Sequence, residues 1–248
     1  MKASIPVLLK KRAWKNRVWQ ERLWRKGALP WLGSVALAVL TLTPAGAAER
    51  PTLLVMGDSL SAAYNIEQDA GWVHLLSERL GENAKVVNAS ISGETSSGAA
   101  ERFPQLISEH SPGVVVIELG GNDGLRGLKP SELYANLAGM IEQSQAADAR
   151  VLLLGIDIPP NYGQAYREAF TEVYPRLAAA HHVALVPFLL DGIALDDALM
   201  QSDGIHPVAE AQPAVLDNVW PVLGPLLAPL PQINVTSSGV AAAQARPE

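Results

Sequence analysis

Five short apolar runs recur along the chain, and longer stretches with helical spacing separate them. The runs lie at residues 53–56, 85–88, 114–119, 151–156 and 183–186. Four of these five runs are continuous rather than alternating, which is typical of strands that are covered on both faces. The regular alternation of strand and helix favours a doubly wound parallel sheet. We therefore expect an α/β fold whose sheet contains five parallel strands.

The helix-like stretches lie at residues 71–80, 97–110, 131–147, 165–182 and 209–227. The last of them contains Pro213 and Pro221. Proline lacks a backbone donor and clashes with the preceding helical turn, so each proline is expected to bend or restart this helix. After the last stretch the chain contains Gln-Ile-Asn-Val-Thr-Ser-Ser-Gly and an end rich in Ala and Gln, and residues 230–248 are predicted to form a disordered tail.

Residues 1–48 have the composition of a secretory signal peptide. Residues 1–27 carry nine basic side chains against one acidic one, and an apolar run of fifteen residues follows at 28–42. Small residues precede the expected cleavage point, after Ala47 or Ala48. The apolar run is shorter than the roughly 20 residues that a spanning helix needs, and an uncleaved anchor is the alternative. We expect a periplasmic or secreted protein with one domain at residues 49–229.

Removal of the leader makes the chain strongly acidic. Its 19 basic and 25 acidic side chains become ten and 24, a net charge near −14. Such a charge argues against nucleic acid or an anionic membrane surface as a partner, because both attract cationic proteins. The absence of cysteine excludes disulfides and thiolate metal sites. We expect a monomer that acts on a small molecule and does not insert stably into a membrane after cleavage.

Two motifs supply the groups that nucleophilic hydrolysis needs. Gly-Asp-Ser-Leu at 57–60 directly follows the first apolar run, and Asp-Gly-Ile-His-Pro occupies 203–207. A serine hydroxyl becomes a good nucleophile when a base takes its proton and a third group orients that base. Ser59, His206 and Asp203 are the candidates for these roles. Of the five histidines, only His206 lies in a loop with an acid three residues before it.

Candidate donors to a tetrahedral oxyanion follow the same strands. Ligands of a parallel sheet bind beyond the carboxyl ends of its strands. Gly93 can bring its backbone N–H close because it has no side chain, Asn122 can add an amide, and the N–H of Ser59 would be the third donor. Each motif alone also fits a helix cap or a turn. The catalytic interpretation is favoured because all the motifs occur in this order, at strand ends or in the last loop.

These motifs resemble the four sequence blocks of the GDSL or SGNH hydrolases. The blocks are matched in order by residues 57–60, by Gly93, by Gly-Gly-Asn-Asp at 120–123 and by residues 203–207. Longer strings at 88–96, 118–127 and 159–163 are similar to the bacterial periplasmic branch called thioesterase I, protease I or lysophospholipase L1, which includes arylesterases. The resemblance covers residues 51–227 and leaves out the leader and the tail.

The resemblance implies a flavodoxin-like three-layer α/β/α fold with no cofactor and no metal. It implies a triad of Ser59, Asp203 and His206 and an oxyanion hole formed by Ser59, Gly93 and Asn122. The implied activity is that of a serine esterase, which hydrolyses aryl esters, acyl thioesters and lysophospholipids through an acyl-enzyme.

Two other functions remain open at this stage. One is a carbohydrate acetyl esterase, against which Leu125, Ile158 and Tyr162 near the expected site favour an apolar acyl pocket. The other is a non-catalytic flavodoxin-like binding module. Such a module has no need of Asp203 and His206 together, and the sequence contains no glycine-rich phosphate-binding motif.

Overall fold

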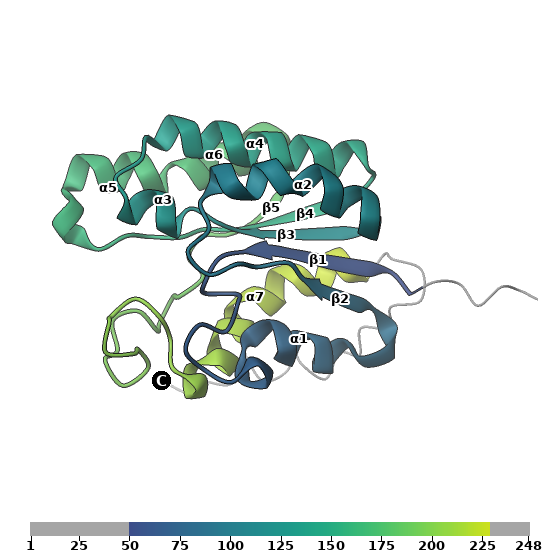
Figure 1. Cartoon of the computed structure of the whole chain (residues 1–248), viewed down its shortest axis with the longest axis horizontal. Coiled ribbons are helices and arrows are strands. Elements are labelled where there is room, and N and C mark those ends of the chain that lie inside the picture. The colour runs from purple at the N-terminus through teal and green to yellow at the C-terminus, as the bar shows by residue number, and fades with distance from the viewer. Residues whose placement is uncertain (1–49, 229–248) are drawn as a thin grey trace, which may run out of the picture. The chain divides into compact units, whose positions relative to one another are not determined.

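A computed structural model describes residues 50–228, which form a three-layer α/β/α domain around one sheet (Figure 1). The strands are β1 (Thr52–Gly57), β2 (Lys85–Asn88), β3 (Val114–Glu118), β4 (Arg150–Leu154) and β5 (Ala184–Val186). All neighbouring strands pair in parallel, in the order β2-β1-β3-β4-β5. This order is that of flavodoxin-like sheets, and the predicted fold class is confirmed.

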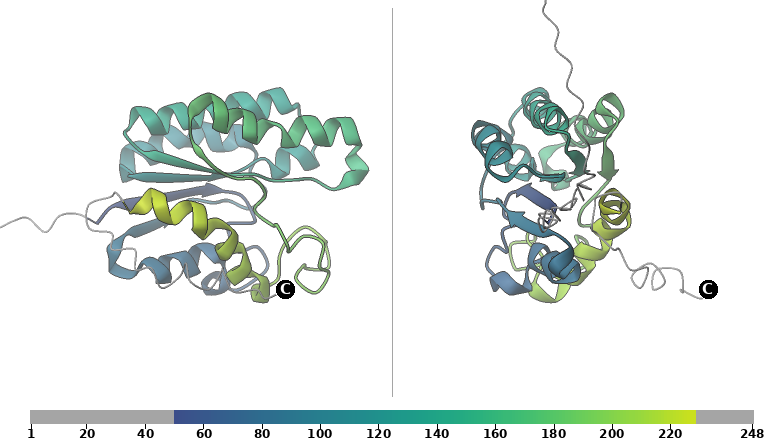
Figure 2. Two further views of the ribbon diagram at one scale, coloured as in Figure 1. Left: turned by 180° about the vertical axis from the view of Figure 1, so that it is seen from behind. Right: turned by 90° about the vertical axis from the view of Figure 1, so that its right-hand side faces the viewer.

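Helices cover both faces of the sheet. The views of Figure 1 and Figure 2 place α1 (Trp72–Leu80) and α7 (Gln212–Leu227) on one face. The other face carries α2 (Ser96–His110), α4 (Pro130–Ala146), α5 (Gln164–Thr171) and α6 (Val173–His181). A short helix, α3 (Gly121–Leu125), follows β3, and 3-10 turns lie at Gln68–Ala70, Gly81–Asn83, Pro160–Tyr162 and Ala209–Ala211. No helix within residues 50–228 has the length and apolar character needed to cross a bilayer.

The burial of the central strands explains their continuous apolar sequence. In β3, every residue from Val114 to Glu118 is buried, and in β1 only Thr52 is partly exposed. Strands with helices on both faces have no solvent-facing side, so alternation is lost. The glutamate at the end of β3 is therefore a buried acid in an otherwise apolar strand.

Two helix predictions differ from the structure. The stretch predicted as one helix at 165–182 is two, α5 and α6, which are separated at Glu172. In the last stretch, α7 begins at Gln212 with Pro213 in its first turn, where the missing donor costs little. Pro221 does not end α7. A proline inside a helix costs about 3 kcal/mol, which the burial of neighbours such as Val219 and Leu223, worth about 1.5–3 kcal/mol each, offsets.

The predicted leader at 1–48 and the predicted tail at 230–248 lie outside the described residues. The assignment of residues 49–229 to one domain remains a prediction.

The sheet places its functional edge between β1 and β3. The connection from β1 runs through α1 on one face to β2, whereas α2 crosses to the other face before β3. This reversal of direction opens a crevice beyond the carboxyl ends of β1 and β3, where doubly wound sheets bind ligands. Gly57 pairs with Glu118 at this edge. The loops that follow β1 and β3 therefore start side by side.

Gly57 is required by a close approach at this edge. A Cβ atom added to Gly57 would lie 2.8 Å from Glu118 Oε2 and from Ser61 Oγ. We expect Gly57→Ala to lower the free energy of unfolding by about 1–3 kcal/mol, because the buried groups around it have no room to move. Urea unfolding followed by circular dichroism measures this change.

Gly139, in the middle of α4, is the matched control, since a Cβ added there would meet nothing within 4 Å. Gly139→Ala should raise the stability by about 0.5–1 kcal/mol. Equal effects of the two substitutions would contradict the close approach at Gly57.

Candidate active site

The loop after β1 carries Ser59 into the crevice. The chain turns sharply there, with the Ala62 N–H donating to the Asp58 carbonyl at 3.0 Å and the Tyr64 N–H donating to the Ser59 carbonyl at 3.3 Å. The turn leaves the Ser59 side chain on the surface of a cavity beyond the strand ends. The first motif therefore forms a strand exit, as the sequence predicts.

Ser59, His206 and Asp203 form a continuous chain of side-chain contacts. His206 Nε2 lies 2.8 Å from Ser59 Oγ, and His206 Nδ1 lies 2.7 Å from Asp203 Oδ2. A carboxylate only accepts hydrogen bonds, so the imidazole proton belongs on Nδ1 and the lone pair of Nε2 faces the serine hydroxyl. This is the arrangement that a base needs in order to take the proton of a nucleophile.

The acid and the base belong to one tightly closed loop. Its ends are joined by an antiparallel bridge between Met200 and Pro207, and the Gln201 N–H donates to the His206 carbonyl at 2.7 Å. Asp203 Oδ1 accepts from the backbone N–H groups of Ile205 at 2.9 Å and His206 at 3.1 Å. The three-residue spacing of Asp203 and His206 is thus the spacing of a side-chain-capped turn.

The same hydrogen bonds set the charge of Asp203. Burial tends to raise the pKa of its carboxyl group, but the bonds from the His206 ring and from the N–H groups of Ile205 and His206 outweigh that effect. The pKa of Asp203 therefore lies below its usual value. Its carboxylate remains ionised at neutral pH and can stabilise an imidazolium at His206.

Asn122 reaches the same cavity from β3. The predicted loop at 120–124 contains the short helix α3, whose first turn includes Asn122. The side-chain amide of Asn122 donates through Nδ2 to Asp58 Oδ2 at 3.1 Å. Ser59, Asn122 and His206 all line one cavity, so the structure brings these three predicted site residues together.

Gly93 lies on the loop between β2 and α2. Its φ angle is 81°, and a Cβ added there would meet no protein atom within 4 Å. Glycine is favoured at this position because the backbone is left-handed, and not because neighbouring protein atoms leave no room for a side chain. Arg126 Nη2 donates to the Gly93 carbonyl at 2.9 Å and ties this loop to the end of α3. Gly93 is not among the residues that line the described cavity.

The cavity has a volume of about 330 Å³ and an apolar wall. Its apolar lining includes Leu125, Ile158, Phe188, Leu190, Met200 and Ile205. Two of the three predicted substrate-binding residues, Leu125 and Ile158, are in this wall. The third, Tyr162, is outside it, and its hydroxyl donates to the Leu125 carbonyl at 2.9 Å. Tyr162 thus supports the wall from behind.

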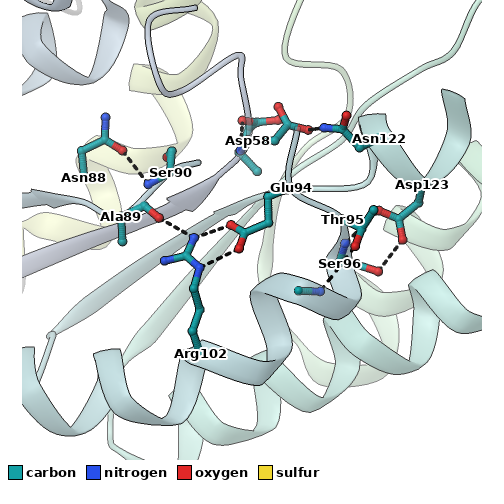
Figure 3. A network of polar contacts seen from close by, with 12 residues as sticks. Asp58, Asn88, Ala89, Ser90, Glu94, Thr95, Ser96, Arg102, Asn122 and Asp123 are labelled. Carbon is teal, nitrogen blue, oxygen red and sulfur yellow. Dashed lines mark hydrogen bonds and ion pairs between the residues drawn. The ribbon is translucent and has the colours of Figure 1, made fainter. Parts of the chain in front are cut away.

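A second network fixes the loop that contains Gly93 (Figure 3). Arg102 of α2 pairs with Glu94 and also donates to the Ala89 carbonyl. Asp123 accepts from the Ser96 N–H at 2.8 Å and from the Ser96 hydroxyl at 2.6 Å. Since Asp123 follows Asn122 in α3, these bonds fix the start of α2 relative to the candidate oxyanion donors.

Sequence reasoning did not identify Tyr64 and Gln201 as site residues. The Tyr64 ring packs against the His206 imidazole, with centroids 4.4 Å apart and the two planes tilted by 38°. Gln201 Nε2 donates to the carbonyls of Tyr64 and Pro207, each at 3.0 Å. Neither residue carries a sequence signal of its own, because a tyrosine in a loop and a glutamine near an aspartate are common.

Two buried acids lie directly beneath the Ser59 turn. Glu118 Oε2 accepts from the Asp58 N–H at 3.2 Å and from the Ser61 hydroxyl at 2.8 Å, whereas Glu118 Oε1 has no partner. Burial raises the pKa of Asp58 to about 6. Burial and then the charge of Asp58 raise the pKa of Glu118 well above its usual value. In the sequence, the only signal for Glu118 is that an acidic residue stands at the end of an apolar run.

Among residues 50–228, no group of three or more His, Asp or Glu side chains is arranged to hold a metal ion.

Comparison with known proteins identifies the relatives of this chain. Residues 55–212 match the family described as "GDSL-like Lipase/Acylhydrolase family". "Esterase TesA" of Pseudomonas aeruginosa is 54% identical over 197 residues, which cover 78% of this chain and 97% of that protein. "Thioesterase 1/protease 1/lysophospholipase L1" of Escherichia coli K12 is 44% identical over 188 residues, which cover 76% of this chain and 90% of that protein.

A solved structure agrees with these matches. The "Crystal Structure of TesA" superposes with a TM-score of 0.69 at 56% identity, covering 71% of this chain and 99% of the other. The family and the branch predicted from the sequence motifs are both confirmed.

The buried Glu118 should make stability depend on pH. A carboxyl group whose pKa is raised in the folded state contributes stability below its unfolded-state value, and that contribution is lost as the pH rises. Glu118→Gln removes this titration at nearly constant volume. Between pH 4 and pH 8, the stability of the variant relative to the unaltered protein should therefore rise.

Urea unfolding at each pH measures the difference, and Glu109→Gln on the exposed surface of α2 is the control. The control should show no such trend. A pH-independent difference for Glu118→Gln would mean that folding does not raise the pKa of Glu118.

Proposed function

The chain belongs to the GDSL-like lipase/acylhydrolase family, and we propose that it hydrolyses carboxylic esters and thioesters through Ser59, His206 and Asp203. The protein is a hydrolase with esterase and thioesterase relatives. The observation that carries the assignment of residues is the chain of contacts at 2.8 Å and 2.7 Å that links Ser59, His206 and Asp203 at the edge of an apolar cavity.

The first half of the reaction forms an acyl-enzyme. His206 Nε2 takes the hydroxyl proton as Ser59 Oγ attacks the carbonyl carbon, and a tetrahedral intermediate forms. When the intermediate collapses, the bond to the leaving oxygen or sulfur breaks. His206 then donates its proton to the departing alcohol or thiol. The acyl group remains on Ser59 as an ester.

The second half regenerates the enzyme. A water molecule takes the place of the leaving group and gives a proton to His206 Nε2 as it attacks the acyl carbon. The bond to Ser59 Oγ breaks, His206 returns the proton to the serine, and the carboxylic acid leaves. Asp203 keeps its carboxylate charge throughout, holds the Nδ1–H tautomer and stabilises the imidazolium.

Three donors are proposed for the oxyanion. They are the N–H groups of Ser59 and Gly93 and the side-chain amide of Asn122. Ser59 and Asn122 both line the cavity, which supports their assignment. For Gly93, support comes from the contacts that tie its loop to α3 through Arg126. Such donors act on the charge that develops in the intermediate, so they lower the barrier more than they improve binding.

The proposed substrates are aryl esters, acyl thioesters and lysophospholipids. The apolar wall that contains Leu125 and Ile158 suits an aliphatic acyl chain better than the polar ring of a sugar. A cavity of about 330 Å³ leaves room for several methylene groups beyond the carbonyl. We therefore assign the cavity to the acyl part of the substrate.

We also propose that the protein acts as a monomer outside the cytoplasm, after cleavage near Ala48. The basic leader with its apolar run supports export. N-terminal sequencing of protein from an exporting host should give a start at Ala48 or Glu49. Light scattering should give the mass of one mature chain. An intact Met1 in the membrane fraction would contradict cleavage.

Ser59→Ala should abolish hydrolysis of an aryl ester without unfolding the protein. The loss should be on the order of 10⁴–10⁶ in kcat, as for other serine nucleophiles. Intact mass spectrometry after treatment with a serine-reactive fluorophosphonate should show no adduct on this variant.

Ser61→Ala is the matched control, because the Ser61 hydroxyl donates to Glu118 and not to His206. This variant should still form the adduct. A folded Ser59→Ala protein that keeps more than a tenth of the activity would overturn the nucleophile assignment.

The length of the acyl chain should control kcat/KM. Each methylene buried in the cavity contributes about 0.8 kcal/mol, which corresponds to about a fourfold gain. Among p-nitrophenyl esters, activity should therefore rise from acetyl to hexanoyl and level off when the cavity is full. A preference for acetyl over all longer acyl groups would favour the carbohydrate acetyl esterase instead.

A further inference from the structure

Asp58 precedes the nucleophile and lies buried against the candidate oxyanion hole. Its side chain is 1% exposed. Both carboxylate oxygens accept hydrogen bonds: Oδ1 accepts from the Leu60 N–H at 3.1 Å and Oδ2 from the Asn122 amide at 3.1 Å. Figure 3 shows the Asp58 carboxylate facing the Asn122 side chain. Asp58 thus touches both the turn of the nucleophile and the amide donor.

We propose that Asp58 is a positioning residue, which fixes the Asn122 amide so that an N–H of Asn122, and not its carbonyl oxygen, faces the reacting carbonyl. The proposal rests on the proposed function, because it assigns the donor role to Asn122. It adds a residue that acts on catalysis through Asn122.

The reason lies in the asymmetry of an amide. The Nδ2 atom of Asn122 carries two hydrogens, and a carboxylate can only accept. One hydrogen of Nδ2 is held by Asp58, which leaves the second for another acceptor. A flipped amide would set its carbonyl oxygen against the Asp58 carboxylate and would present an acceptor in place of a donor. Two facing acceptors repel each other, so the carboxylate selects one of two amide orientations.

The position of the Asp58 carboxylate is itself fixed by buried contacts. Glu118 accepts from the Asp58 N–H at 3.2 Å, below the turn. On the other side, a Cβ added to Gly121 would lie 3.2 Å from Asp58 Oδ2, so the start of α3 packs closely on the carboxylate. Because the Asp58 carboxylate is fixed on both sides, the Asn122 amide that it holds does not have to reorient when negative charge develops on the substrate oxygen.

A competing role for Asp58 is to shape the Ser59 turn through the Leu60 N–H. The two roles make different predictions for a double-mutant cycle, because a residue that acts through Asn122 has nothing to act on when that amide is removed. The cycle consists of Asp58→Ala, Asn122→Ala and the double variant, with kcat and KM measured on one aryl ester.

Asn122→Ala should lower kcat by about 10²–10³, as the loss of one oxyanion donor does elsewhere. Asp58→Ala should lower kcat by at least about tenfold with little change in KM, since a misoriented donor fails mainly in the transition state. The double variant should be no slower than Asn122→Ala alone.

Asp58→Asn is the second variant and serves if Asp58→Ala does not fold. It preserves the shape of the side chain but has a single acceptor oxygen for the two donors Leu60 N–H and Asn122 Nδ2. Its kcat should therefore also fall by at least about tenfold. Ser61→Ala is the control within the cycle, because Ser61 bonds to Glu118 on the same turn and not to Asn122. Its effect should persist unchanged in the Asn122→Ala background.

Two results would overturn the proposal alone. They are an Asp58→Ala loss that persists in full beside Asn122→Ala, and an Asp58→Asn variant with unaltered kcat. An Asn122→Ala variant with unaltered kcat would overturn both this proposal and the donor role of Asn122. Failure of the proposed function as a whole has a separate signature, since it would appear as an unaltered protein that neither hydrolyses the aryl ester nor forms the fluorophosphonate adduct, or as retained activity of the folded Ser59→Ala variant.

Discussion

All five strands run in the same direction, and every candidate catalytic group depends on that constraint. Parallel pairing brings the carboxyl ends of β1 and β3 to one edge, where Gly57 pairs with Glu118. The nucleophile follows one of these strands and Asn122 follows the other. The reversal of strand order between them opens the crevice in which Ser59 meets His206. The backbone of the sheet thus sets the distances on which the chemistry relies.

The site is built on uncompensated buried acids. Asp58, Glu118 and Asp123 are 1%, 0% and 3% exposed, and none of them forms a salt bridge with the residues that the structure describes. Backbone N–H groups, hydroxyl groups and the Asn122 amide donate to them instead, and Glu118 Oε1 has no partner. Buried charges without cationic partners are costly for stability. These acids lie together behind the Ser59 turn. We infer that they lower the stability of this region and at the same time hold the candidate oxyanion donors in a fixed arrangement.

The sequence predicted the sheet, because continuous apolar runs are a local signal of strands that are covered on both faces. It also predicted the hydrogen-bonded residues Ser59, His206 and Asp203, because the three-residue spacing of acid and base is a local signal as well. It was not sufficient for contacts between distant segments. Nothing local shows that Asp58 meets Asn122, which is 64 residues away, or that the Tyr64 ring packs against His206. The break at Glu172 was also missed, since the apolar pattern continues across it. For Gly93 the sequence offered only the missing side chain, whereas the structure adds a left-handed backbone that favours glycine at this position.

The closed loop at 200–207 has a consequence for how activity is lost. Its bridge and its turn contacts join acid and base locally, whereas a contact spanning 147 residues joins the base to the nucleophile. Once its contacts with Ser59, Tyr64 and Asn65 break, the loop would therefore separate from the sheet as a unit with its internal pair intact. Local openings of this kind cost less free energy than global unfolding. Inactivation by mild denaturant would then precede the collapse of secondary structure and would reverse on dilution.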